Sequence, residues 1–286
     1  MTPATGRAAG VGTEGTGTTG APVRFRDLVA AERIKMWSLR STWWALGLIL
    51  VSMVGLAAYA ALATTDGWAG WSPEQRSLHS PLGDAFPDEA QLFVILAASA
   101  VGTVAVGGEY ASGLFRGTFA AVPHRGAVAA AKVLVLATVT TAVGVLGAAA
   151  AFTVAQVILT DVGAQMSVTD PGALRGITAS ALLVPLSALI GTAVAALVRH
   201  SAPAIVAATA LLLLLPTALD EDERWTAMLR HAMPVAAWQR LMETGEPPPW
   251  ISLPYRATVG GAWGTYAGWT LVAALLTVAA IHRHDP

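Results

Sequence analysis

The sequence contains no cysteine and few charged residues, and both absences narrow the class of protein. Without cysteine, the chain can have no disulfide, no thiolate nucleophile and no cysteine ligand for a metal. Charged residues make up 12% of the chain, against about 25% in an ordinary soluble domain. The 17 Lys and Arg nearly balance the 18 Asp and Glu, so the basic excess of a nucleic-acid-binding protein is also missing. What remains is a very apolar globular protein or a membrane protein.

The charged residues are missing from six long apolar runs. A soluble core helix usually keeps a charged solvent face, which none of these runs has. Their lengths approach the roughly 20 residues that a membrane-spanning helix needs, and they lack the alternation of barrel strands. The sequence therefore predicts an all-α integral membrane protein with six transmembrane helices. The predicted spans are residues 43–63, 90–107, 133–159, 177–198, 202–219 and 262–281.

The positions of Lys and Arg predict the orientation of these spans. With the N-terminus inside, 11 of the 17 basic residues fall in the inner segments, as the positive-inside rule favours. We therefore expect a multi-pass protein of a bacterial plasma membrane with both termini in the cytoplasm. The Ala-rich composition is typical of a high-GC, actinobacterial genome.

The N-terminal region divides into two parts. Residues 1–22 are rich in Gly and Thr and are predicted to be disordered, which leaves residues 23–286 as one domain. Residues 24–42 are predicted to form an amphipathic helix in the inner membrane interface. Glu32 interrupts its apolar face. It is interpreted either as a carboxylate paired with Lys35 or Arg33, or as a polar contact to a cytoplasmic partner.

The segment between the fifth and sixth spans contains two short amphipathic stretches, within residues 224–245. Both are too short to cross a membrane. They are predicted to form either a re-entrant hairpin or a surface-lying lid, and the sequence does not separate the two.

Glycines four residues apart, Gly260, Gly264 and Gly268, mark the entry to the last span. This spacing allows helices to approach closely in lipid. We interpret the row as helix packing within the chain rather than as a dimer seam.

The sequence lacks the motifs of the common catalytic sites. It has no P-loop, no H-E-x-x-H and no G-x-S-x-G, and its histidines do not have metal-ligand spacing. No predicted span contains an ionisable residue, although proton-coupled pumps and intramembrane proteases usually need one. We therefore expect no catalytic residues, no metal and no cofactor bound by this chain.

The second inner loop, about residues 107–132, is the most informative segment. Phe115, Phe119 and Val122 recur at helical spacing, and Pro123 ends the pattern. A short amphipathic helix between two spans could dock a soluble partner. The alternative is an interfacial helix with snorkelling Arg side chains.

The stretches AERIKMWSLRSTWW and GEYASGLFRGTFAAVPHRGAVAAAK, in this order, resemble permease subunits of ABC-2 type transporters. In that family, an interfacial helix with an acidic residue and a Lys precedes the first span. A loop with an acidic residue, Gly, Arg or Thr, Pro and a basic residue joins spans two and three. The matching residues are Glu32 and Lys35 in the first element, and Glu109, Gly113, Arg116, Thr118, Pro123, Arg125 and Lys132 in the second.

The resemblance implies a membrane subunit that forms a translocation path, usually for export, and has no enzyme activity by itself. A separate ATP-binding subunit would carry ATP and Mg²⁺, and a second permease subunit would complete the path. The residues implied in coupling to the ATPase subunit are Glu32, Lys35, Glu109, Gly113, Arg116, Phe119, Pro123 and Arg125. The alternatives are a structural or scaffold membrane protein, such as a degenerate permease, and, less favoured, a membrane enzyme.

Overall fold

The computed structural model describes residues 24–114, 124–219, 223–245 and 255–283, and helix is the only regular structure within these ranges. The predicted disordered tail therefore lies outside the described residues. The α-helices are α1 (Phe25–Ser38), α2 (Arg40–Gly67), α3 (Pro73–Leu78), α4 (Pro81–Ala85), α5 (Asp88–Ser112), α7 (Arg125–Leu159), α8 (Ala173–Val198), α9 (Ser201–Thr209), α10 (Leu215–Thr217), α11 (Arg224–His231), α12 (Pro234–Met242) and α13 (Val259–Arg283).

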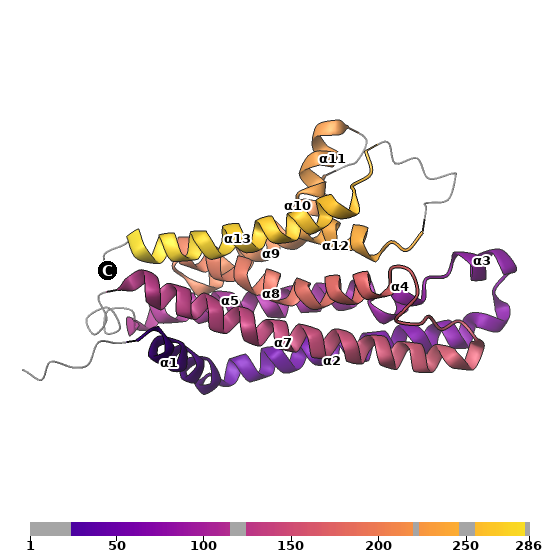
Figure 1. Cartoon of the computed structure of the whole chain (residues 1–286), viewed down its shortest axis with the longest axis horizontal. Coiled ribbons are helices and arrows are strands. Elements are labelled where there is room, and N and C mark those ends of the chain that lie inside the picture. The colour runs from indigo at the N-terminus through magenta and orange to yellow at the C-terminus, as the bar shows by residue number, and fades with distance from the viewer. Residues whose placement is uncertain (1–23, 115–123, 220–222, 246–254, 284–286) are drawn as a thin grey trace, which may run out of the picture.

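Five helices of the described chain, α2, α5, α7, α8 and α13, are long and apolar enough to cross a membrane. They run alongside one another down the long axis of the molecule (Figure 1). They correspond to five of the six predicted spans, which confirms the helical fold class and is compatible with a multi-pass membrane protein. The helices extend beyond the predicted limits because a search for charge-free runs stops at the first charged residue, whereas the helical backbone continues.

The remaining predicted span, residues 202–219, forms a shorter apolar helix over Ser201–Thr217. Its 17 residues rise about 25 Å, less than the roughly 30 Å of a bilayer core. The helix is also irregular, because the π-helical turn η3 (Ala210–Leu214) separates α9 from α10. Length and composition therefore support five spanning helices, with this shorter helix in addition.

Helix α8 lies at the centre of the bundle, because glycines let its neighbours approach its backbone. A Cβ atom on Gly102 of α5 would collide with the carbonyl oxygen of Ala188, and one on Gly191 of α8 would collide with that of Ser99. Gly144 of α7 lies equally close to the backbone of α8. As a result, α8 is the most buried of the five long helices, at 78% of its apolar window.

The glycine row Gly260, Gly264 and Gly268 does not have the packing role that its spacing predicted. All three glycines are exposed on α13, and among the described residues a Cβ atom on any of them would meet no atom of a neighbouring element within 4 Å. The interpretation as a packing row within the chain is therefore wrong. Spacing alone does not tell which side of a helix faces its neighbours.

Helix α1 packs on the bundle through the face that the sequence assigned to the membrane interface. It ends at Ser38, and the extended backbone of Leu39 (φ −87°, ψ 114°) separates it from α2. Glu32 and Met36 are buried on the side that contacts α7, whereas Ile34 and Trp37 are exposed.

The two predicted amphipathic stretches between the last spans are the short helices α11 and α12. Helix α12 packs against α8 and α13, where Trp238 Nε1 donates a hydrogen bond to Ser180 Oγ at 3.0 Å. Helix α11 projects away from the bundle (Figure 1). Its Trp225 and Met228 side chains are exposed.

The central packing gives a direct stability test. Replacing Gly191 by Val puts a branched side chain against the backbone of α5, so we expect a loss of at least about 2 kcal/mol of stability. Thermal unfolding of the purified protein in detergent measures this loss. Gly264→Val is the matched control and should leave the melting temperature within experimental error. Equal effects of the two substitutions would contradict the central position of α8.

Candidate functional site

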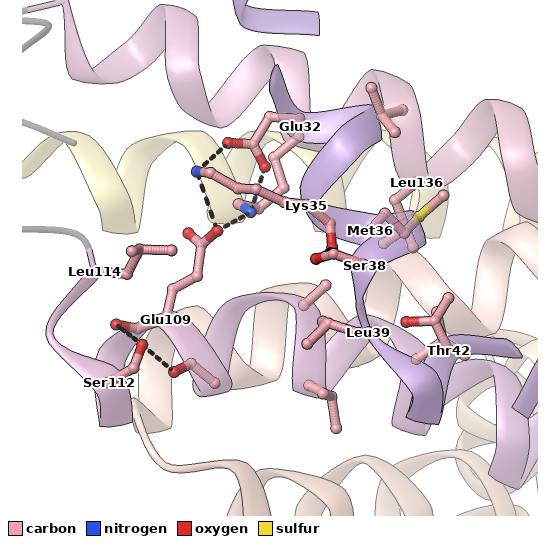
Figure 2. Close-up of a pocket in the computed structure, with 16 residues that line it drawn as sticks. Glu32, Lys35, Met36, Ser38, Leu39, Thr42, Glu109, Ser112, Leu114 and Leu136 are labelled. Carbon is pink, nitrogen blue, oxygen red and sulfur yellow. Dashed lines mark hydrogen bonds and ion pairs between the residues drawn. The ribbon is translucent and has the colours of Figure 1, made fainter. Parts of the chain in front are cut away.

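Four charged side chains from three helices meet at the end of the bundle where α1 lies (Figure 2). Lys132 Nζ donates to Glu32 Oε2 at 2.5 Å and to Glu109 Oε1 at 2.9 Å. Lys35 Nζ donates to Glu32 Oε1 at 2.7 Å and to Glu109 Oε1 at 3.3 Å. Each lysine therefore bridges both carboxylates, and the four charges sum to zero. We call this set the ion cluster; its members are Glu32, Lys35, Glu109 and Lys132.

The local sequence explains why these four residues converge. Glu32 and Lys35 are three residues apart on α1 and therefore share a helix face. Glu109 lies in the last turn of α5, which ends where Gly113 adopts a left-handed conformation (φ 68°) that glycine accommodates without strain. Lys132 lies two turns into α7. The cluster thus joins three helices that are far apart in the sequence.

Burial makes the ion pairs of the cluster interdependent. Glu32 and Lys132 are 5% exposed and Glu109 is 8% exposed, whereas the Lys35 side chain keeps 30% of its surface. Burial alone would lower the pKa of Lys35. The hydrogen bond to Glu32 and the negative charges of Glu109 and Glu32 outweigh burial and raise the pKa above its usual value. Lys35 therefore stays a cation in this cluster.

One oxygen of the cluster has no hydrogen-bond partner among the described residues. Glu109 Oε2 is buried and receives no hydrogen bond from them, so it loses the hydrogen bonds that water would give it. The four charged residues help to line a cavity of about 280 Å³. The rest of the lining combines apolar side chains, such as Met36 and Leu136, with the hydroxyls of Ser38 and Thr42.

The structure brings together part of the predicted coupling set. Glu32, Lys35 and Glu109 are in the cluster, and the pairing expected between Glu32 and Lys35 is confirmed. Gly113 caps α5, and Arg125 opens α7. The other three predicted residues lie outside the described residues: Arg116, Phe119 and Pro123.

Lys132 is the cluster residue that sequence reasoning undervalued. It matches the loop pattern but is not among the residues implied in coupling to the ATPase subunit. Instead it lies within α7 and contacts both carboxylates. A usable signal was the charge balance, because Glu32 and Glu109 together need two cations and Lys35 supplies only one.

No other chemistry is evident around the cluster. Across the described ranges, no group of three or more His, Asp or Glu side chains could hold a metal ion. Two carboxylates that are each bridged by the same two lysines are suited to joining helices. Comparisons with protein-family models and with curated proteins find no match for this chain.

The cluster predicts unequal effects of removing its two lysines. Lys132→Met leaves two buried carboxylates with a single cation, so we expect a loss of about 3 kcal/mol or more. Lys35→Met should cost about 1 kcal/mol, because water screens this more exposed pair. Thermal and denaturant unfolding in detergent measures both losses.

A double substitution checks the physical reason for this difference. Adding Glu109→Gln to Lys132→Met removes one uncompensated carboxylate, so the double variant should be more stable than Lys132→Met alone. Additive losses would show that the lysine acts through packing rather than charge.

Proposed function

We propose that this chain is the membrane subunit of an ABC-2 type transporter that works as an exporter and is driven by a separate ATP-binding subunit. ATP and Mg²⁺ would be held by that partner and not by this chain. The proposal rests on the order of the two sequence elements and on the ion cluster that joins them.

The observation that carries the proposal is the buried contact between the two elements. The α1 element supplies Glu32 and Lys35, and the α5–α7 element supplies Glu109 and Lys132. A partner that pushes on α1, or on the connection between α5 and α7, would act on both helices at once. Because α5 and α7 pack closely on α8, such a displacement would reach the centre of the bundle.

We further propose that the chain crosses the membrane six times, with Ser201–Thr217 as the short fifth crossing and both termini in the cytoplasm. Two observations support this topology. Helix α1 and the end of α13 lie at the same end of the molecule (Figure 1). In the six-span arrangement, the segments at that end contain most of the Lys and Arg residues, as expected for the cytoplasmic side.

A second permease subunit is also part of the proposal. The exposed glycine row on α13 offers a surface where another helix could approach closely. The competing candidate is a scaffold membrane protein, in which the ion cluster would only hold α1 in place. The two differ in whether an ATPase binds and responds.

We expect a separate P-loop ATPase to copurify with the chain when it is extracted from its native membrane in mild detergent. In the complex, Glu109→Gln should reduce the permease-dependent stimulation of ATP hydrolysis at least tenfold while the ATPase still copurifies. The physical reason is that the substitution weakens the bridge between α1 and α5. Mass spectrometry of the complex and ATP hydrolysis in vesicles are the measurements.

Glu243→Gln serves as the matched control for this substitution. Glu243 follows α12, outside the ion cluster, and pairs there with Arg240, so it should leave the stimulation unchanged. Absence of any copurifying ATPase would favour the scaffold. If Glu109→Gln stimulates ATP hydrolysis as fully as the unchanged chain, the ion cluster has no role in coupling.

The absence of cysteine makes the topology testable with single-cysteine variants. We expect Ser77→Cys and Thr226→Cys to react with a membrane-impermeant maleimide in intact cells. His200→Cys and His282→Cys should react only after permeabilisation, because six crossings place them inside. Labelling at position 282 in intact cells, with position 226 protected, would mean that Ser201–Thr217 does not cross.

A further inference from the structure

Three arginines and one glutamate gather where α8 begins, α12 ends and α13 begins, away from the ion cluster at the α1 end (Figure 1). Arg240 Nη1 donates to Glu243 Oε2 at 3.0 Å, and Arg256 Nε donates to the same oxygen at 3.2 Å. Arg175 Nη2 donates to the backbone carbonyl oxygen of Glu243. We call this set the arginine cluster; its members are Arg175, Arg240, Glu243 and Arg256.

The arginine cluster is not neutral. Among the described residues, its three guanidinium groups face one carboxylate, which leaves two positive charges in excess, because arginine stays protonated in proteins. The pKa of Arg240 reflects this crowding. Burial lowers the pKa below its usual value, and the positive charges of Arg256 and Arg175 lower it further, although Glu243 acts in the opposite direction. The ion cluster, by contrast, pairs two lysines with two carboxylates.

Each guanidinium of the arginine cluster is held along one edge and keeps an unbonded amino group. Arg175 Nε donates to the carbonyl oxygen of Leu241 at 2.9 Å, and Arg240 Nε donates to that of Ala257 at 2.6 Å. Three amino groups make no hydrogen bond within the described chain: Arg175 Nη1, Arg240 Nη2 and Arg256 Nη1. None of them is a buried atom that lacks a partner, so these N–H groups are open to solvent. The cluster therefore presents accessible donors in fixed positions.

Accessible donors with an excess of positive charge suit a doubly charged oxyanion. A guanidinium presents parallel N–H groups whose geometry matches the oxygens of a phosphate group. A phosphomonoester has a charge of about −1.5 to −2 at neutral pH, close to the two positive charges in excess in the arginine cluster. A phosphodiester or a carboxylate has a single negative charge and would leave one of them unbalanced. Charge and donor geometry together therefore indicate a phosphomonoester.

We propose that the arginine cluster binds the phosphate group of a phosphomonoester. The unbonded Nη groups donate to the phosphate oxygens, while Glu243 neutralises one of the three positive charges without contacting the ligand. The same phosphate chemistry is present in a soluble phosphate ester and in a lipid such as phosphatidic acid, and the experiments below separate these sources. The alternative is a structural clamp, in which Glu243 and the arginines only fasten the end of α12 to α8 and α13.

The test uses the full chain purified in detergent and isothermal titration calorimetry at constant ionic strength, at about pH 8, where a phosphomonoester is doubly charged. Glycerol phosphate, a phosphomonoester, is the probe, and dimethyl phosphate, a singly charged diester, is its comparison. We expect glycerol phosphate to bind at least tenfold more tightly, because only the monoester balances both excess charges. Equal affinities, or no binding of glycerol phosphate, would overturn the proposal and leave the structural clamp.

Charge variants separate the binding site from the clamp, because their expected effects have opposite signs. Glu243→Gln keeps an acceptor oxygen for Arg240 and Arg256 and removes the competing negative charge, so glycerol phosphate should bind at least threefold more tightly. Arg256→Gln removes one cation and its donors, so binding should weaken at least fivefold. Arg224→Gln, which removes an exposed arginine of α11 outside the cluster, is the matched control and should leave the affinity unchanged. Weaker binding in Glu243→Gln, or equal losses in Arg224→Gln and Arg256→Gln, would overturn the proposal.

A competition experiment identifies the source of the phosphate. The chain is placed in phosphatidylcholine nanodiscs with or without phosphatidic acid, and glycerol phosphate is titrated again. Weaker apparent binding in the presence of phosphatidic acid would assign the site to a lipid phosphate, whereas unchanged binding would assign it to a soluble ester; either result supports a phosphomonoester site. Equal competition by phosphatidylglycerol, a diester lipid, would overturn the proposal. These measurements involve no ATPase, so their outcome is independent of the transporter proposal.

Discussion

Burial of four charges at one end of an otherwise apolar bundle is the constraint on which the arrangement of helices depends. A carboxylate moved out of water loses several kcal/mol of hydration, and only close opposite charges restore it. Glu32 can therefore be buried only while Lys132 is in place, and Lys132 only while both carboxylates are. This mutual requirement fixes α1 against α5 and α7 in a way that apolar contacts, which tolerate sliding, do not.

The interior of the bundle is held by a different interaction. In lipid, apolar side chains gain little by leaving the hydrocarbon, so close backbone packing has to hold the helices together. Gly102 and Gly191 remove the side chains that would keep α5 and α8 apart. The charges thus set the position of α1, and the glycines set the spacing of the central helices. A movement imposed at the cluster would meet a closely packed interior.

The sequence predicted the helical class and five of the long helices, because lack of charge over about 20 residues is a strong local signal. The side on which a glycine faces a neighbour is a tertiary property, so the spacing of Gly260 and Gly264 indicated a contact that the described part of the chain does not make. Lys132 directly precedes the predicted span 133–159 but lies within α7, because the helix continues beyond the end of the charge-free run. The pairing of Glu32 with Lys35 was predictable from their i, i+3 spacing, whereas Glu109 and Lys132 come from other helices.

The short helix Ser201–Thr217 is much shorter than the long helices of the bundle. Helix α7 has 35 residues and rises about 52 Å, roughly twice the length of this helix. Val206 and Leu214 of the short segment are exposed on the outside of the bundle. A bilayer in contact with this side would have to reduce its hydrocarbon thickness to match the short helix, at a cost of a fraction of a kcal/mol per ångström. A crossing by Ser201–Thr217, as proposed above, would therefore make the thickness of the bilayer vary around the protein.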